Sequence, residues 1–121
     1  MVAASWYVKV IIAAEARGVA CLILVIPTKE SVYWHLARDV LSKEERTELE
    51  RLAVQETLVR DKILVFLEQE GIHFLDLLPS MRQAAEHTTL YPEHADGHPL
   101  GAGYRVIAME IQRRLQELGL H

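Results

Sequence analysis

An aspartate and a histidine separated by one residue, Asp96 and His98, are the side chains of this sequence best suited to chemistry. An aspartate at this spacing can accept the Nδ1 proton of the imidazole, which fixes the ring tautomer and leaves Nε2 free to take a proton from a nucleophile. General-base catalysis by a positioned histidine accelerates a reaction on the order of 10² to 10⁴. The pair therefore predicts an acid–base site, in which His98 is the base and Asp96 orients it. The alternative is a loop pair that only caps the following helix, since aspartate is common at helix starts.

The residues after the pair predict a loop that turns directly into a helix. Pro99 suits the first turn of a helix, where a missing amide donor costs little. Gly101 and Gly103 allow tight turns and close approach of the backbone to neighbouring atoms. We therefore expect His98 at the N-terminus of the last helix, beside the carboxyl ends of the strands, where open α/β sheets place their sites.

Hydrophobic patterning predicts the elements that position this loop. Two apolar runs, Val19–Ile26 and Ile72–Leu75, are typical of buried strands, and Cys21 is expected to be buried in the first of them. Ser42 and Glu45 form a capping box at a helix start, and Thr28 can cap another helix. The periodicity predicts helices over Trp6–Arg17, Thr28–Arg38, Ser42–Gly71 and Gly101–Leu118, with glycines at positions 18, 71 and 119 as stops. The longest is expected to bury a stripe made of Leu49, Leu52, Ala53, Val59, Ile63, Phe66 and Leu67.

Three stretches resemble the SGNH (GDSL-like) hydrolases. The segment from Leu90 to Ala108, LYPEHADGHPLGAGYRVIA, is similar to the last sequence block of that family, in which an Asp and a His precede a proline, a glycine and an apolar helix. The single residue between Asp and His is a spacing shared with the carbohydrate O-acetyltransferase branch. VIPTKESVY (Val25 to Tyr33) and FLDLLP (Phe74 to Pro79) are similar to further stretches in the same order. Leu100 and Tyr104 depart from the family, which often has Asn and His there.

The resemblance implies an α/β fold with a three-layer, flavodoxin-like parallel sheet and flanking helices, present only as its C-terminal half. Residues 1–121 are then expected to be the C-terminal portion of a single SGNH hydrolase-like domain. Alternation of strands and helices along the chain independently favours a parallel sheet. Because two strands do not make a stable parallel sheet, we expect either a missing N-terminal half or self-association.

The resemblance also implies a serine esterase or O-acyltransferase in which Asp96 and His98 are the catalytic residues present. The family takes its nucleophile from a Gly-Asp-Ser turn and holds the oxyanion with a glycine and an asparagine. This chain has no asparagine, and none of its four serines, Ser5, Ser31, Ser42 and Ser80, lies in such a turn. We therefore expect this chain to be inactive alone and to act, when completed, on a small-molecule or carbohydrate ester without a cofactor.

Two alternatives come from other functional classes. His94, Asp96 and His98 form an H-x-D-x-H pattern with His87 nearby, and imidazole and carboxylate ligands suit Zn²⁺ or a non-haem iron in a metal-dependent hydrolase. The second alternative is a non-catalytic interaction domain. The remaining polar and aromatic candidates have simpler expected roles. Lys29 and Glu30 are expected in the first turn of a helix, with a position facing the Asp96–His98 cleft as the alternative. Tyr33 and Trp34 are expected to be packing residues, and Asp76 is expected to form a turn.

Composition limits the partners. Half of the 121 residues are hydrophobic and a quarter are charged, which is ordinary globular composition. The formal net charge of −4 argues against a nucleic-acid partner, because phosphate binding requires a basic face. The apolar N-terminal stretch is interrupted by charges, so neither a secretory signal nor a membrane-spanning segment is predicted within this chain. Localisation is left open, although members of the SGNH family are often periplasmic or secreted.

Overall fold

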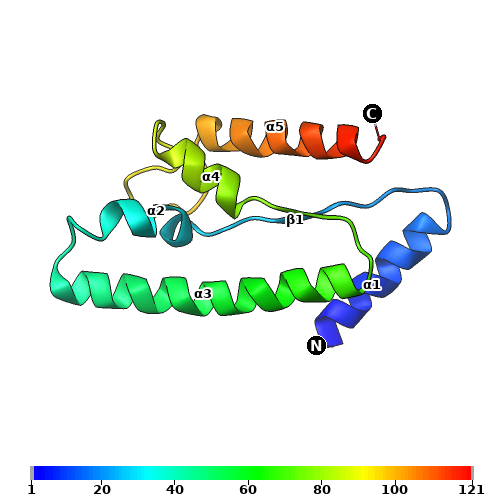
Figure 1. The fold of residues 1–121 in the computed structure, drawn as a ribbon, viewed down its shortest axis with the longest axis horizontal. Coiled ribbons are helices and arrows are strands. Elements are labelled where there is room, and N and C mark those ends of the chain that lie inside the picture. Colours follow the sequence, from blue (N-terminus) through cyan, green and yellow to red (C-terminus); the bar gives the residue numbers. More distant parts are fainter. Residues whose placement is uncertain (1, 121) are drawn as a thin grey trace.

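The structure, a computed structural model, describes residues 2–120 and is mixed α/β with mostly helical content (Figure 1). The elements, in chain order, are α1 (Val2–Glu15), β1 (Ile23–Val25), α2 (Lys29–Ala37), α3 (Lys43–Gln69), β2 (Phe74–Asp76), α4 (Leu78–Ala85) and α5 (Gly101–Glu117). The predicted caps are confirmed: Thr28 Oγ1 accepts the Ser31 amide, and Ser42 and Glu45 form a reciprocal capping box. Positive-φ glycines follow α1, α3 and α5 as predicted.

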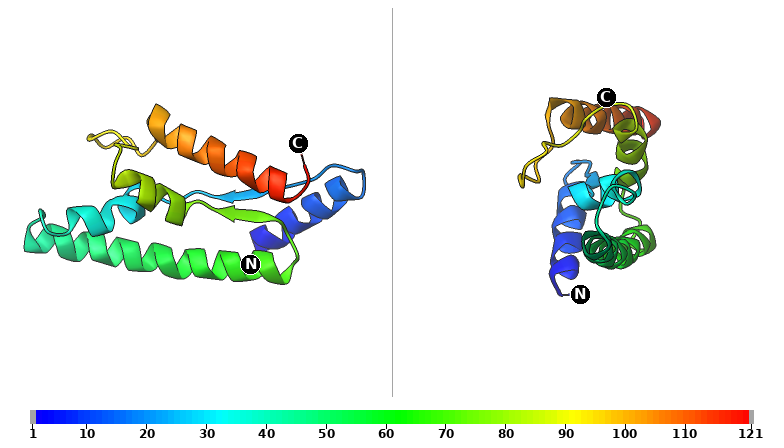
Figure 2. Two further views of the ribbon diagram at one scale, coloured as in Figure 1. Left: turned by 45° about the horizontal axis from the view of Figure 1, so that its top comes forward. Right: turned by 90° about the vertical axis from the view of Figure 1, so that its left-hand side faces the viewer.

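The two strands pair in parallel, with Ile23, Leu24 and Val25 opposite Phe74, Leu75 and Asp76. Successive strand side chains point to opposite faces, and helices lie on both of them: β2 contacts α3 on one side and α5 on the other (Figure 2). The prediction of an α/β chain with parallel strands is therefore confirmed at this coarse level. Within residues 2–120 the sheet has two strands.

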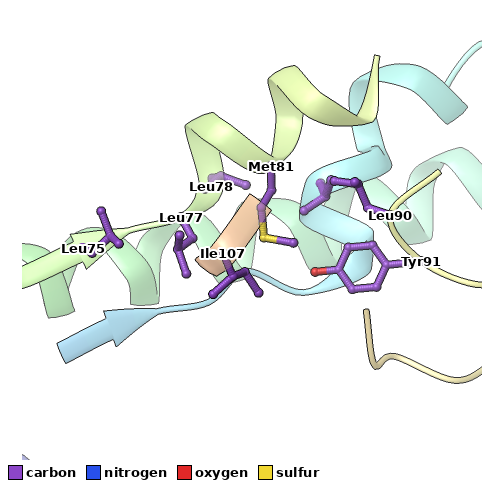
Figure 3. Close-up of a cluster of buried hydrophobic side chains, with 8 residues drawn as sticks. Leu75, Leu77, Leu78, Met81, Leu90, Tyr91 and Ile107 are labelled. Atoms are coloured by element: carbon purple, nitrogen blue, oxygen red, sulfur yellow. The ribbon is translucent and has the colours of Figure 1, made fainter. Parts of the chain in front are cut away.

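Two hydrophobic clusters hold the layers together. The major cluster lies against α4 and α5 and consists of the buried residues Val32, Leu75, Leu77, Leu78, Met81, Leu90, Tyr91 and Ile107 (Figure 3). The minor cluster lies between the sheet, α1 and α3, and its buried members are Ile11, Leu67 and Ile72. The major cluster thus joins the start of the Asp96–His98 loop to the last helix.

Both predicted strands have different bounds from those observed. The run Val19–Ile26 forms a strand only at Ile23–Val25, while Val19 and Ile26 are exposed and Cys21 is half-buried rather than buried. The second strand begins at Phe74 and not at Ile72, whose amide donates to the Leu67 carbonyl. The physical reason is that a strand extends only as far as its partner: β2 is three residues long, so β1 pairs over three residues.

The inward face of α3 also differs from the predicted stripe. Ala53 and Leu67 are buried as expected, but Leu52 and Val59 are exposed. The inward face instead includes two charged residues, Glu56 and Arg60, which bond to polar groups of other elements. The prediction from hydrophobic periodicity was wrong here because Glu56 and Arg60 face inward, where each bonds to a polar group of another element.

The chain covers its apolar surface incompletely. Its accessible surface is 8408 Å², whereas a monomer of this mass is expected to expose about 6,600 Å². Large side chains of α1 and α3 are exposed, among them Trp6, Tyr7, Val54 and Leu58. In the part of the chain that the structure describes, no helix combines the length and apolar character needed to cross a membrane.

Candidate active site

The loop that carries Asp96 and His98 is closed at its base. The Leu100 amide donates to the Leu90 carbonyl at 2.7 Å, so the two ends of the segment lie side by side. Gly103 is required here, because a Cβ atom at this position would lie 2.8 Å from the Leu90 carbonyl oxygen and 2.7 Å from Pro99 Cβ. The predicted close approach at this glycine is therefore confirmed.

The sequence suggested that Pro99 lies in the first turn of the last helix, but Pro99 precedes that helix. The N-cap is Leu100, whose backbone is extended, and α5 begins at Gly101. The bond from the Leu100 amide to the Leu90 carbonyl holds the chain extended at this point, so the helix starts two residues after Pro99. His98 lies just before the N-terminus of α5, and both this position and the helix start at Gly101 agree with the sequence prediction.

Asp96 and His98 are bonded to each other through one carboxylate oxygen. Asp96 Oδ1 lies 2.6 Å from His98 Nδ1 and also accepts the His98 backbone N–H at 2.9 Å. With the ring proton on Nδ1, this contact is a hydrogen bond from His98 to Asp96, and Nε2 is an unprotonated acceptor. The pair lies in solvent, since the His98 side chain is 84% exposed and that of Asp96 is 47% exposed.

The same contacts change the acidity of the carboxyl group. The pKa of Asp96 lies below its usual value, first because the His98 backbone N–H donates to it and second because the His98 ring does. Hydrogen bonds to the charged form favour that form. Asp96 is therefore an anion where it faces the ring, as an orienting carboxylate must be.

Tyr91 fixes the loop against the carboxyl end of the sheet. Its side chain is 2% exposed, and its hydroxyl donates to the carbonyl of Pro27, which follows β1, at 3.4 Å. The ring packs edge-on against Tyr33 of α2 with centroids 5.8 Å apart. Burial raises the pKa of Tyr91 to about 12, so the hydroxyl stays a donor. The loop thus lies beyond the carboxyl ends of the strands, where the sequence predicted it (Figure 1).

Two α2 side chains bind the loop, and the sequence interpretation did not assign them that role. The Tyr33 hydroxyl oxygen accepts the backbone N–H groups of Leu90 at 3.0 Å and Tyr91 at 3.1 Å. Lys29 Nζ donates to the carbonyl of His94 at 2.8 Å and to the carbonyl of Pro92. Tyr33 is therefore more than a packing residue, and Lys29 faces the loop. The available signal was their spacing, since residues four apart share a helix face.

Polar side chains of α3 hold the end of β2 and the start of α2. Glu56 accepts the Thr28 backbone N–H at 2.9 Å and the Thr28 hydroxyl, at the start of α2. Arg60 donates to both carboxylate oxygens of Asp76, the last residue of β2. Asp76 Oδ1 also accepts the Leu78 amide at 3.2 Å, so its predicted role as a turn former is confirmed.

The histidines of the H-x-D-x-H pattern bond to Asp96 and do not point with it toward one metal position. His94 Nδ1 accepts the Asp96 backbone N–H at 3.3 Å, while His98 Nδ1 faces the Asp96 carboxylate. His94 is an exposed loop residue, as expected. Across residues 2–120, no three His, Cys, Asp or Glu side chains are grouped so that they could hold one metal ion.

The serines with described side chains have other environments. Ser31 is buried near the start of α2, Ser42 caps α3, and Ser80 lies within α4. Among residues 6–120, none of these hydroxyls is hydrogen-bonded to His98, whose only side-chain partner there is Asp96. Among residues 6–120, the structure thus brings Asp96 and His98 together without a serine hydroxyl bonded to the imidazole.

Comparisons of this chain with protein-family models, curated proteins and solved structures find no match. The assignment to the SGNH hydrolases therefore stays a prediction that depends on the three sequence stretches and on the geometry of the loop.

Proposed function

We propose that this chain supplies the general base and its orienting carboxylate to an SGNH-type serine esterase or O-acyltransferase. The observation that carries the proposal is the 2.6 Å contact between Asp96 Oδ1 and His98 Nδ1, with the imidazole otherwise open to solvent. An aspartate in this position holds the tautomer that a general base requires and stabilises the imidazolium that forms during the reaction.

The proposed reaction needs a serine from polypeptide outside these 121 residues. That serine hydroxyl attacks the carbonyl carbon of an ester while His98 Nε2 takes its proton. The tetrahedral intermediate collapses to an acyl-serine, and His98 returns the proton to the leaving alcohol. Water then hydrolyses the acyl-serine, or an acceptor hydroxyl takes the acyl group, with His98 again the base. The substrate is a small-molecule or carbohydrate ester, with acetyl as the favoured acyl group.

The incompleteness of the fold supports a site completed from outside. A sheet of two strands is smaller than the roughly four to six strands that sheets most often contain. The accessible surface exceeds that expected for this mass by about 1,800 Å², which is about twice the roughly 800 Å² that each partner buries in a standard protein–protein interface. We propose that further strands extend this sheet into a flavodoxin-like, three-layer domain whose C-terminal half is the chain described here.

The test is ester hydrolysis by the protein isolated from its source cells through a tag, so that any covalent extension or bound partner is retained. With p-nitrophenyl acetate, His98→Ala is expected to lower kcat/KM on the order of 10² to 10⁴. Asp96→Asn is expected to have a comparable effect, because asparagine does not hold the His98 ring in the tautomer that leaves Nε2 unprotonated. His87→Ala is the matched control, because His87 is also exposed but lies in the turn just after α4. A chelator is expected to leave the activity unchanged, and loss of activity on chelation would favour a metal-dependent hydrolase.

The isolated chain gives a complementary test. Without a serine beside His98, the purified 121 residues are expected to hydrolyse p-nitrophenyl acetate no faster than the His98→Ala variant. Strong hydrolysis by the purified chain that His98→Ala abolishes would overturn the proposal that the nucleophile comes from outside. Equal activity of the wild-type protein and both site variants in the isolated native assembly would instead favour a non-catalytic interaction domain.

A further inference from the structure

Helix α2 presents two side chains to the loop that contains the Asp96–His98 pair. Lys29 and Tyr33 are four residues apart in α2, so they lie on one face, one turn from each other. Both reach the segment that begins at Leu90, more than 50 residues further along the chain. The loop has no regular secondary structure between α4 and α5, so its backbone groups need partners from elsewhere.

The two side chains bind different parts of the loop. Tyr33 accepts the amides of Leu90 and Tyr91, residues that are already buried in the major cluster. Lys29 instead binds carbonyls further along, at Pro92 and at His94, where the loop enters solvent. An ammonium group that donates to two carbonyls makes charge-assisted bonds, which are stronger than neutral ones. Lys29 therefore holds the part of the loop that burial does not hold.

A continuous set of bonds leads from Lys29 to the imidazole. Lys29 Nζ binds the His94 carbonyl, and His94 Nδ1 accepts the Asp96 backbone N–H. Asp96 Oδ1 in turn accepts both the backbone N–H and Nδ1–H of His98. Among residues 6–120, the hydrogen bonds that join this exposed tip to another element are those of Lys29. Hydrogen bonds thus connect the pair to a side chain of another helix.

We propose that Lys29 is a positioning residue for the Asp96–His98 pair: its bonds to the Pro92 and His94 carbonyls hold the loop in the conformation in which Asp96 faces His98 Nδ1. That this orientation serves catalysis rests on the proposed function, whereas the positioning itself does not. Lys29 Nζ is bonded to the Pro92 and His94 carbonyls and not to Asp96 or His98, so it acts through the loop backbone.

The rest of α2 is anchored independently of Lys29, which makes the role separable from folding. Glu56 binds the backbone and the hydroxyl of Thr28 at the start of the helix. Arg82 of α4 donates to the Ser31 carbonyl at 3.0 Å, and Val32 is fully buried in the major cluster. Replacing Lys29 is therefore expected to leave α2 in place and to release only the loop tip.

The test is the tautomer of neutral His98 in the purified 121-residue chain, read from the ¹⁵N chemical shifts of its ring. In the wild-type chain the Nδ1–H tautomer is expected to dominate, because Asp96 accepts that proton. In Lys29→Met the ratio of Nδ1–H to Nε2–H is expected to fall roughly fivefold, the change that follows from loss of one typical hydrogen bond. Lys29→Arg is expected to retain the wild-type ratio, because guanidinium can also donate to two carbonyls. Lys62→Met, an exposed lysine of α3, is the matched control.

An unchanged tautomer ratio in folded Lys29→Met would overturn the inference, whatever the esterase assay shows. If Lys29→Met does not fold, the wild-type chain still decides: the Lys29 ammonium protons are expected to exchange with water more slowly than those of Lys62. Equal exchange of the two lysines would contradict the two-carbonyl contact. A tautomer shift in Lys29→Met together with full esterase activity of His98→Ala in the native assembly would uphold the positioning and reject the proposed function.

Discussion

The two hydrophobic clusters on opposite faces of the sheet differ in how completely they exclude water. The major cluster has eight buried members, and Val32, Leu77, Met81 and Leu90 have no accessible surface. The minor cluster has three, each between 6% and 8% exposed, and its neighbouring helix α1 leaves Trp6 and Tyr7 in solvent. One face of this chain is therefore a formed core, whereas the other is only partly covered.

The difference shows where the geometry of the candidate site comes from. Leu90 and Tyr91 are members of the major cluster and also the first residues of the loop that carries the pair. The base of the loop is thus as well fixed as the core itself, while its tip depends on Lys29 and on bonds within the loop. Exposed large hydrophobic side chains lie on α1 and α3 and also at Leu100 and Tyr104 beside the loop base, and these surfaces are available to the polypeptide that we propose completes the site.

The largest expected effect separates the two clusters. Met81→Ala removes a side chain with no accessible surface from the major cluster, and the resulting cavity is expected to lower the free energy of unfolding by about 3 to 5 kcal/mol. Ile11→Ala in the minor cluster is expected to cost about 2 kcal/mol or less, because partly exposed neighbours can close the space. Urea denaturation of the purified variants measures both values. Equal losses would show that the two faces are equally well packed.

A smaller effect is expected at the base of the loop. Gly103→Ala places a Cβ atom against Pro99 and the Leu90 carbonyl, and this overpacking is expected to cost about 1 to 3 kcal/mol. Gly101→Ala is the matched control. Gly101 is the first residue of α5, and an added Cβ there meets nothing within 4 Å. That control is expected to be neutral or slightly stabilising, by up to about 1 kcal/mol, because alanine restricts the unfolded chain. If both variants unfold at the same urea concentration, the loop base is not packed as described.

Local signals in the sequence predicted the features that local physics determines. The Ser42–Glu45 box, the Thr28 cap and the glycine after α3 were predictable, because capping depends on residues within one turn. The contact between Asp96 and His98 was predictable for the same reason, since both lie in one short loop.

Features that depend on distant partners were not predictable. The strand bounds follow from pairing of β1 with β2, some 50 residues apart along the chain, and hydrophobicity in the first run continues beyond that pairing. Glu56 and Arg60 look like solvent-facing residues until their partners Thr28 and Asp76 are known. Lys29 likewise has a local explanation as a first-turn residue, and only the fold reveals that it binds carbonyls 63 and 65 residues away.

The smallest expected effect concerns the loop tip and pH. Because the folded-state pKa of Asp96 lies below its usual value of 3.8, its anion stabilises the folded loop above that value, and this contribution is lost as pH falls through the lower folded-state pKa. The carboxyl ¹³C shift, followed through an acid titration, is expected to show a midpoint below 3.8. His98→Ala is expected to raise the midpoint only part of the way, since the backbone N–H of residue 98 remains. His87→Ala is expected to leave it unchanged, and a wild-type midpoint at or above the usual value would show that the pair does not form in solution.

The most direct test of the central claim is covalent labelling of the native assembly with a fluorophosphonate, which reacts with activated serines. The protein isolated from its source cells is expected to be labelled on a serine outside the 121 residues described here. The labelling rate is expected to fall on the order of 10² to 10⁴ in His98→Ala and to be unchanged in His87→Ala. Labelling that maps to any of the four serines of this chain, or a rate that does not depend on His98, would contradict the assignment of His98 as the base for a serine supplied from elsewhere.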